Sequence, residues 1–379
     1  MFIAGEASGD TLGAELAKVI KSKRPNAQFF GAAGPRMAAQ GVDLAFDLTE
    51  HAVVGIVEVL KNYSKFKGFF DRLLTLAVER KPDAIILIDY PGFNLRFAEA
   101  VKKRSATISD WKPKVVFYVS PQIWAWHESR IHQIARDIDL LLTIFPFEKG
   151  WYRARKPELH VEFVGHPIVD RHARFKAGKP QPLEEPTSPE PLILLLPGSR
   201  IRELKKHLPP MIDAVRNIRR QRKAQFKMVL PSHSLAELAQ SYVSSDNSIE
   251  IATSDLPESL ARASLAIASS GTVTMECAYF GVPTIVLYRT SFSTHFLGRR
   301  FIKVKYLAMP NLLADEMIYP EFIQSAATAD NISRKAIELL NNTEGRRVIK
   351  AKLLKVIESL GPGGASERAA DAILHLIAK

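Results

Sequence analysis

The sequence predicts an α/β protein with two doubly wound, Rossmann-like domains, each built on a parallel sheet, that face one another across a cleft. Short apolar runs alternate with longer segments that repeat apolar residues at the helical period. The alternation stops at one proline-rich stretch and then restarts, which indicates two separate sheets. In such folds ligands bind beyond the carboxyl ends of the strands, so functional residues are expected there.

The first domain is expected over residues 1–175. Its strands are predicted at Phe2–Ala4, Ala84–Ile88, Val115–Val119 and Leu140–Ile144, and its helices at Thr11–Lys23, Leu95–Arg104 and Ser129–Arg136. Unbroken apolar runs such as the one that ends at Ile88 are typical of strands that are buried on both faces.

A linker is expected at residues 176–191, where the chain carries five prolines and almost no apolar residue. The second domain follows over residues 192–345. Its strands are predicted at Leu192–Leu196, Phe226–Leu230, Ile249–Ala252, Leu265–Ala268 and Thr284–Leu287, and its helices at Pro209–Arg222, Leu235–Ser244 and from Thr272 onward. Residues 346–379 are expected to form C-terminal helices that pack back on the first domain or on a partner.

The composition is that of an ordinary soluble globular protein, with 46% hydrophobic and 24% charged residues. The single cysteine, Cys277, excludes an intramolecular disulfide and fits a reducing compartment. No apolar run approaches the roughly 20 residues that span a bilayer, and Met1 to Ala4 is too short for the apolar part of a signal peptide. A cytoplasmic location is therefore expected.

The net charge of +12 suggests an anionic partner. Nucleic acid and an anionic membrane surface are the usual partners of such a chain, and solvated helix faces are the plain alternative. A nucleic-acid-binding protein would carry basic residues and exposed aromatics in a known module, and the sequence contains no such module. Nucleic acid is not expected as a partner, while a membrane surface stays open.

The block "IASSGTVTMEC" is the first candidate ligand site. A strand runs into Ser269, Ser270 and Gly271, small residues that let the main chain approach a ligand, and a helix opens at Thr272. The N-terminus of the helix that follows suits a phosphate or diphosphate. Glu276, one turn further on, is suited to accept the hydroxyls of a ribose. The plain alternative is a helix cap followed by a surface glutamate.

A second loop, "LLPGSR", brings Arg200 to the same edge of the same domain. The guanidinium offers a planar fork of donors that suits phosphate oxygens. By itself this residue could equally be a solvated turn arginine. Two anion-binding groups at one edge favour a nucleotide diphosphate over two unrelated turns.

In the first domain, "IDYPGFN" places Asp89 where a strand must end, because Pro91 and Gly92 follow at once. This carboxylate either caps the next helix or takes part in chemistry. The block "GEASGD" resembles a phosphate loop but matches neither of the two standard glycine-rich patterns. A substrate loop is expected there, with Ser8 as a hydrogen-bond donor beside Gly9, and a plain helix cap is the alternative.

Aromatic residues of the first domain are candidates for an apolar wall. Trp124, in "SPQIWAWH", either packs in the core or lines an apolar or sugar-binding wall at the mouth of the cleft. Phe66, Phe69 and Phe70 lie among lysines, which suits a surface that touches anionic lipid. Packing of these helices in the core is the alternative. No His, Cys and Asp cluster has metal-ligand spacing, so neither a metal nor a cofactor is expected.

Ten sequence blocks in order resemble those of lipid-A-disaccharide synthase, a cytoplasmic, membrane-associated glycosyltransferase family of the GT-B type. They are "GEASGD", "GAAGPRM", "VVGIVEVL", "IDYPGFN", "YVSPQIWAW", "FPFEK", "FVGHP", "LLPGSR", "SSGTVTMEC" and "MPNLLA". They extend from Gly5 to about Ala314. The first strand is shorter than is usual in the family, and the linker is longer and more polar.

The resemblance implies transfer of diacylglucosamine from UDP-2,3-diacylglucosamine to 2,3-diacylglucosamine 1-phosphate (lipid X). The products are a β-1,6-linked disaccharide phosphate and UDP, formed by inversion without a metal. Peripheral association with the cytoplasmic face of the inner membrane is also implied. The oligomeric state, monomer or homodimer, stays open.

The same resemblance assigns roles to particular residues. Asp89 matches the acid proposed as general base, and Asn311 is assigned to the UDP site. Ser8, Arg200 and Glu276 match other residues tied to activity. Asn94 lies nearer the helix start, so we expect it to cap the helix in place of Asp89.

Two other functions fit part of the pattern. A UDP-sugar epimerase shares the two-domain fold and would also use a strand-end carboxylate, but it has no need of an apolar and basic region around Phe66. A nucleotide-sugar binder without catalysis would not depend on Asp89.

Overall fold

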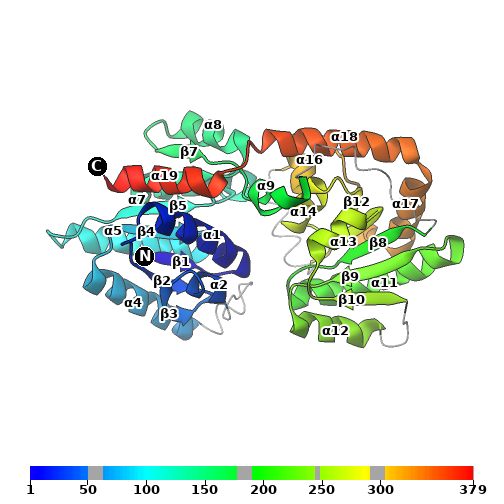
Figure 1. Ribbon diagram of the computed structural model, residues 1–379, viewed down its shortest axis with the longest axis horizontal. Coiled ribbons are helices and arrows are strands. Elements are labelled where there is room, and N and C mark those ends of the chain that lie inside the picture. Colours follow the sequence, from blue (N-terminus) through cyan, green and yellow to red (C-terminus); the bar gives the residue numbers. More distant parts are fainter. Residues whose placement is uncertain (50–62, 177–189, 244–247, 291–303, 379) are drawn as a thin grey trace. The chain divides into compact units, whose positions relative to one another are not determined.

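The computed structural model describes residues 1–49, 63–176, 190–243, 248–290 and 304–378, and the chain divides into two compact units (Figure 1). Unit 1 comprises Met1–Asp170 and Leu360–Lys379, and unit 2 comprises Arg171–Ser359. Most of the expected linker (177–189) and the block at 53–60 lie outside the described residues.

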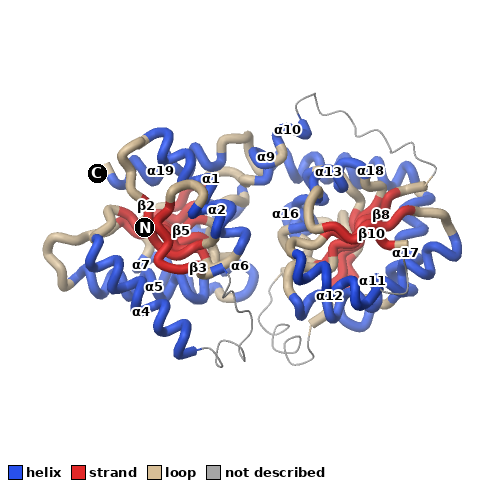
Figure 2. Tube along the Cα trace, turned by 60° about the horizontal axis from the view of Figure 1, so that its bottom comes forward, coloured by secondary structure: helices blue, strands red, loops and turns tan. Residues whose placement is uncertain are grey.

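Unit 1 contains a seven-stranded parallel sheet with the order β3-β2-β1-β4-β5-β6-β7. The strands are β1 (Phe2–Ala4), β2 (Phe29–Ala33), β3 (Val42–Asp47), β4 (Ala84–Ile88), β5 (Lys114–Tyr118), β6 (Leu140–Thr143) and β7 (Val161–Phe163). Every residue of β1, β4 and β6 is buried, because helices cover both faces of the sheet (Figure 2).

The helices of unit 1 lie around this sheet. They are α1 (Ala7–Lys23), α2 (Pro35–Ala38), α4 (Tyr63–Arg80), α5 (Pro91–Ala106), α6 (Ile123–Trp126), α7 (Ile131–Asp137), α8 (Pro146–Arg155), α9 (Ile168–Arg171) and α19 (Ala365–Ile377), with a 3-10 turn η2 (Glu128–Arg130). α9 ends one residue into unit 2.

The last helix, α19, packs against α1 within unit 1. The Asp170 carboxylate accepts the main-chain N–H groups of Gly364 and Ala365 at 2.5 and 2.8 Å, which satisfies two amides at the start of α19. Lys23 of α1 forms an ion pair with Asp371 at 2.5 Å. The C-terminal segment thus completes the unit that contains the first strand.

Unit 2 contains a six-stranded parallel sheet with the order β10-β9-β8-β11-β12-β13. Its strands are β8 (Leu192–Leu196), β9 (Gln225–Val229), β10 (Ile249–Ala252), β11 (Leu265–Ser269), β12 (Thr284–Tyr288) and β13 (Glu321–Ile323). Its helices are α10 (Ala173–Lys176), α11 (Ile201–Gln221), α12 (His233–Val243), α13 (Leu256–Arg262), α14 (Val273–Tyr279), α16 (Met309–Ala314), α17 (Ala329–Asn341) and α18 (Thr343–Ser359), with a 3-10 turn η3 (Gln324–Ala326).

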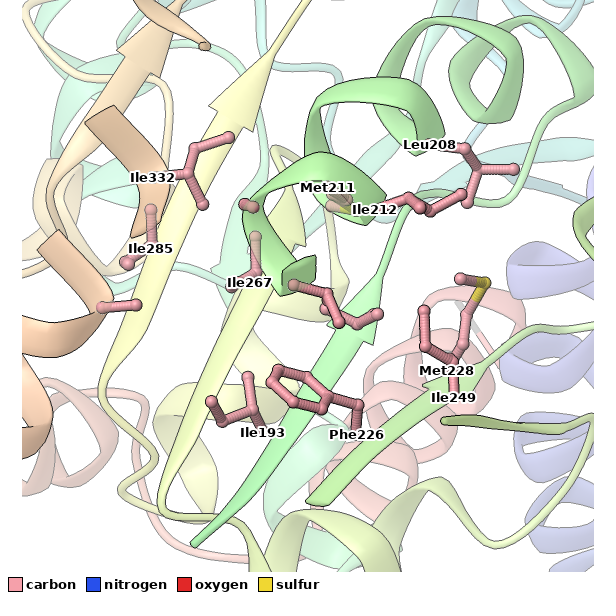
Figure 3. Packing of buried hydrophobic residues seen from close by; sticks show 14 of the residues in the cluster. Ile193, Leu208, Met211, Ile212, Phe226, Met228, Ile249, Ile267, Ile285 and Ile332 are labelled. Carbon is pink, nitrogen blue, oxygen red and sulfur yellow. The ribbon is translucent and has the colours of Figure 1, made fainter. Parts of the chain in front are cut away.

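The core of unit 2 forms where α11 and α17 pack on the sheet (Figure 3). Strand residues such as Ile193, Ile267 and Ile285 meet Met211 of α11 and Ile332 of α17, and all five side chains are fully buried. Each side chain of this size contributes about 1.5–3 kcal/mol when it leaves water. The two parallel sheets and their helical layers confirm the predicted fold class.

Within the described ranges, no helix is both long enough and apolar enough to cross a membrane.

The packing of β2 against β1 yields a stability prediction. Gly31 of β2 has φ +150°, and a Cβ added there would lie 1.9 Å from the main-chain oxygen of Phe2. We expect Gly31→Ala to lower the free energy of unfolding by about 3 kcal/mol or more, because the strands would have to separate. Urea unfolding measures this change.

Gly150→Ala is the matched control. Gly150 is an exposed residue inside α8, and an added Cβ there would meet no atom within 4 Å. Because alanine favours the helix, this variant should be more stable by up to about 1 kcal/mol. Equal unfolding midpoints for Gly31→Ala and the wild type would contradict the close strand approach.

Candidate functional site

The carboxyl end of β4 carries Asp89 in a turn of unusual backbone geometry. Asp89 and Tyr90 have φ values of +48° and +49°, so two consecutive residues other than glycine adopt the left-handed conformation. Each costs about 1–2 kcal/mol and persists only where the surroundings enforce it. The main-chain N–H of Asp89 donates to the Tyr118 carbonyl of β5 at 2.8 Å. Such strain is typical of functional turns.

Asn94 is one of the groups that enforce this turn, and the prediction that it caps the helix is wrong. α5 begins at Pro91 and its N-cap residue is Tyr90, so Asn94 lies inside the first turn. Its side chain is fully buried, and Nδ2 donates to the carbonyls of Ile88 at 3.2 Å and of Asp89 at 2.7 Å. Asn94 therefore positions the main chain that carries Asp89.

Ser8 lies at the neighbouring strand end, because β1 pairs with β4 and Ala4 is opposite Ile88. α1 begins at Ala7, earlier than predicted, and its N-cap is Glu6, so Ser8 is an exposed residue of the first helical turn. Gly9 is buried, and an added Cβ there would lie 3.3 Å from Cβ of Ala4. Ser8 and Asp89 thus belong to adjacent strand ends of one sheet.

The role predicted for Trp124 as an exposed wall does not fit its position. Only 8% of Trp124 is exposed, and its indole Nε1 donates to Oε1 of Glu148 at 3.0 Å. Its ring also packs edge-on against Phe147, with ring centroids 5.0 Å apart. The alternative stated from the sequence, packing in the core, is the correct one for this residue.

Glu148 is a buried acid that the sequence analysis did not single out, although it lies in the quoted block "FPFEK". It is 1% exposed, and Oε2 accepts the main-chain N–H of Phe145 at 3.1 Å, which closes a capping box at the start of α8. Burial raises the pKa of this carboxyl to about 7, against the lowering effect of its hydrogen bonds, chiefly that from Trp124. Through Phe145 and Trp124, the Glu148 carboxyl connects the end of β6 with the segment after β5.

The raised pKa of Glu148 predicts a pH-dependent stability. The folded protein keeps a proton that the unfolded chain loses above about pH 4.5, so this group stabilises the fold at low pH and the stabilisation is lost as the pH rises through 7. Glu148→Gln carries no titrating group. Between pH 5 and 8, the variant's free energy of unfolding relative to the wild type should therefore rise by roughly 2 kcal/mol.

Urea unfolding of both proteins at pH 5 and 8 provides the measurement. Glu79→Gln, an exposed carboxyl on α4, serves as the matched control. A wild-type-to-variant difference that is the same at both pH values would show that the carboxyl does not titrate in this range.

The predicted wall of Phe66, Phe69 and Phe70 lies on α4 and stays a prediction. Phe69 and Phe70 are half-buried and pack against the hydrophobic core of unit 1. Phe69 stacks on Phe46 at 4.5 Å and contacts Phe66 edge-on at 6.3 Å, and Phe70 packs edge-on against two rings of α5 at 5.5 Å. These rings join α4 to the rest of the unit, and each of them keeps part of its surface exposed.

In unit 2, two candidate loops lie side by side because β8 pairs with β11, and Leu196 is opposite Ala268. After β11, the Ser270 N–H donates to the Leu287 carbonyl at 3.2 Å, and its hydroxyl donates to the Leu307 carbonyl at 3.1 Å. A Cβ added at Gly271 would meet no atom within 4 Å, so the main chain there borders open space. Thr272 is the N-cap of α14.

The loop after β8 is held by Glu203 of α11. Its Oε2 accepts the N–H of Ser199 at 3.0 Å, and its Oε1 accepts from Nη1 of Arg200 at 3.3 Å. Gly198 has φ +127°, and an added Cβ there would lie 2.4 Å from Oε2 of Glu203. The glycine therefore lets the loop approach Glu203, and the Arg200 side chain is 44% exposed at the start of α11.

Glu276 lies in a cluster that the sequence analysis missed. Its carboxylate contacts Nε2 of His172, and Oε1 lies 3.7 Å from Nη1 of Arg171. The His172 side chain is 5% exposed and lies against the rings of Tyr279 and Phe280. The only sequence signal for this pair is a basic dipeptide that follows "HPIVD".

Asn311 lies inside unit 2, and the direct UDP contact predicted for it does not fit this position. The residue is fully buried, and Nδ2 donates to the Tyr319 carbonyl at 2.7 Å and to Oε1 of Glu321 at 2.8 Å. Its Oδ1 accepts the Tyr319 N–H at 2.7 Å. Glu321 in turn accepts the main-chain N–H groups of Leu307 and Ala308, at 2.9–3.1 Å. Because Ser270 donates to the Leu307 carbonyl, Asn311 supports the candidate loop from behind.

This arrangement predicts a structural cost for Asn311→Ala. The change removes the side-chain partners of the Tyr319 main-chain N–H and carbonyl and one of the donors to Glu321, so the free energy of unfolding should fall by about 2–4 kcal/mol in the absence of any ligand. Urea unfolding checks this, with Asn217→Ala as control, because Asn217 makes its hydrogen bond to Asp330 at the surface. Unchanged stability of Asn311→Ala would restore the predicted contact role.

Across the part of the chain that the structure describes, no group of three His, Cys, Asp or Glu residues is arranged to hold a metal ion.

The two doubly wound parallel sheets, with polar groups at their carboxyl edges, define the class of GT-B glycosyltransferases and their structural relatives. The chain is similar to the solved structure of a putative UDP-N-acetylglucosamine 2-epimerase from Listeria monocytogenes, with a TM-score of 0.61 and 16% identity over 98% of this chain and 94% of that one. It is also similar to the calicheamicin glycosyltransferase CalG4, with a TM-score of 0.60 and 12% identity over 100% and 97%. At such identities the likeness shows the fold alone.

Sequence comparison identifies the family. Residues 1–374 match the family described as lipid-A-disaccharide synthetase. The chain is 36% identical to the lipid-A-disaccharide synthase of Geobacter metallireducens over 389 residues, covering 100% of this chain and 97% of that protein. It is 36% identical to lipid-A-disaccharide synthase 1 of Legionella pneumophila over 369 residues, covering 96% and 94%. The chain therefore belongs to the lipid-A-disaccharide synthase family, a glycosyltransferase of lipid A biosynthesis, and the resemblance predicted from the sequence is confirmed.

Proposed function

We propose that the protein transfers diacylglucosamine from UDP-2,3-diacylglucosamine to the 6-hydroxyl of lipid X, with release of UDP and inversion at the anomeric carbon. The family assignment supports the class of reaction. The observation that carries the mechanism is the strained turn after β4, where buried main-chain contacts hold the carboxylate-bearing residue Asp89 at the edge of its sheet.

In this mechanism Asp89 is the general base. A sugar hydroxyl is a poor nucleophile at neutral pH. A positioned carboxylate that removes its proton as the glycosidic bond forms raises the reaction rate by about 10²–10⁴-fold. Asn94 and the Tyr118 carbonyl fix the main chain on either side of this residue. Ser8, exposed at the adjacent strand end, would donate a hydrogen bond to the acceptor sugar.

Unit 2 would bind the UDP part of the donor. The amides at Gly271 and Thr272 and the guanidinium of Arg200 would meet the diphosphate, and their positive charge would stabilise UDP as it leaves without the need for a metal. Glu276 would accept the ribose hydroxyls, with its carboxylate held by Arg171 and His172. Ser270 and Asn311 would position the loop and make no contact with the ligand.

The substrates also lead to a proposal for location. Both substrates carry acyl chains, and the protein has a net charge of +12. We therefore propose that the protein associates peripherally with an anionic membrane surface. Sedimentation with vesicles that contain anionic lipid, at low and high salt, tests this. Equal recovery in the supernatant with and without vesicles at low salt would contradict it.

Replacement of the proposed base gives the central prediction. Asp89→Asn keeps the size of the side chain but cannot accept the proton, so kcat should fall by at least about 10²-fold. The dissociation constant of UDP should stay within about twofold, because the variant leaves unit 2 unchanged. Release of UDP and formation of the disaccharide are followed by mass spectrometry, and UDP binding by calorimetry.

Asp43→Asn is the matched control, because Asp43 is an exposed acid of the same unit whose carboxylate pairs with Arg80. Its kcat should equal that of the wild type. Full turnover by Asp89→Asn would exclude this residue as the base. Epimerisation of a UDP-sugar, with no disaccharide formed from the two lipid substrates, would instead support an epimerase.

A further inference from the structure

His207 is a buried imidazole of α11 with a defined partner at each ring nitrogen. None of its surface is exposed. Nδ1 lies 2.7 Å from the Pro197 carbonyl, and Nε2 lies 3.1 Å from the main-chain N–H of Arg289, which donates to it. The predicted donor-site residues do not include this histidine, and its sequence block "KKHLPP" carries no motif.

The two partners determine the protonation state of the ring. A carbonyl oxygen can only accept a hydrogen bond, so Nδ1 must carry a hydrogen. An amide N–H can only donate one, so Nε2 must be unprotonated. His207 is therefore neutral, with its proton on Nδ1. A second proton, on Nε2, would place two N–H donors against one another, and the Arg289 N–H would lose its hydrogen-bond acceptor.

The partners are also the first residues after two strands. Pro197 follows β8 and starts the loop that carries Arg200, and Arg289 follows β12. In the sheet β11 lies between β8 and β12, with Ala268 opposite Leu196 and Ser269 opposite Leu287. The imidazole thus links the two strand ends that flank the loop at Gly271.

We propose that His207 is a positioning residue of the nucleotide site, whose neutral Nδ1–H tautomer holds the loops after β8 and β12 at the spacing that a nucleoside diphosphate requires. The inference rests on the proposed function, since it assigns the loops at Arg200 and Gly271 to UDP. It adds a residue that makes no contact with the ligand and acts through the main chain.

The surroundings of the ring favour the neutral form. Burial lowers the pKa of His207 below its ordinary value, and the hydrogen bond to Pro197 and the charge of Glu203 oppose this effect. The charged groups that face the ring are Glu203 on its own helix and Arg289 at the end of β12. Because the pKa is lowered in the folded protein, the contribution of this group to stability is complete above about pH 6.5 and is lost as the pH falls through the folded pKa.

Three variants separate the two hydrogen bonds. His207→Gln offers an oxygen near the position of Nε2, His207→Asn offers an amide nitrogen near that of Nδ1, and His207→Phe offers neither. We expect UDP at pH 7.5 to bind about 10-fold or more weakly to the Phe variant and about 3–10-fold more weakly to the other two. His233→Gln, at an exposed position of α12, should bind UDP as the wild type does.

The pH profile distinguishes a positioning role from a purely structural one. Between pH 7.5 and 5.5, protonation of UDP itself weakens binding equally in all variants. Only the wild type carries the imidazole, so the ratio of its UDP affinity to that of His207→Gln should fall once the pH is low enough to protonate the ring. Calorimetric titration with UDP measures this ratio.

Several outcomes would overturn the proposal. A ratio that stays constant down to the pH at which nitrogen NMR shows the ring to be protonated, or wild-type UDP affinity in His207→Phe, would exclude the positioning role while leaving the proposed function intact. Nitrogen NMR of the wild type tests the tautomer without any variant, and a proton on Nε2 at pH 7.5 would exclude it. If the wild type itself binds no UDP, the proposed function fails and this inference fails with it.

Discussion

The whole structure depends on the parallel arrangement of both sheets. Because every strand of a parallel sheet runs in one direction, the turns that follow the strands all lie along one edge of the sheet. Asp89 follows β4, Gly198 and Arg200 follow β8, and Ser270 follows β11. Within each unit, residues that are far apart in the chain are brought to one edge of the sheet for this reason.

A second feature common to both units is that buried polar side chains hold these turns through the main chain. Asn94 donates to the carbonyls of Ile88 and Asp89, and Asn311 binds both main-chain groups of Tyr319. Glu148 connects the segments that follow β5 and β6, and His207 connects those that follow β8 and β12. A buried polar group without a partner costs about 1–3 kcal/mol, so each of these residues allows essentially one geometry of its turn. The exposed side chains of Arg200 and Ser8 therefore project from turns whose main-chain conformation is fixed.

The elements that the sequence predicted best are the central strands. The run Ala84–Ile88 and the run Leu192–Leu196 are strands with the predicted bounds, because a strand covered on both faces must be apolar throughout. Helix starts were less accurate. α5 begins at Pro91, not at Leu95, because two left-handed residues before it complete the turn earlier than the local sequence suggests. Trp124 was assigned to a wall because an aromatic residue in a helix or loop has the same local signature whether it is buried or exposed.

By itself, the sequence determined the two-sheet fold class, the family and the strand ends at which chemistry is expected, since these depend on local periodicity and on motifs in order. Only the tertiary structure decided which polar residues are buried. Asn311 and Asp89 are both polar residues in conspicuous motifs, yet Asn311 has no exposed surface and both ends of its amide are engaged within the fold. Its partners are Glu321 of β13 and Tyr319 in the segment before that strand, and such pairings arise only when the chain packs. Burial and partner choice are properties of the folded chain, and no local pattern encodes them.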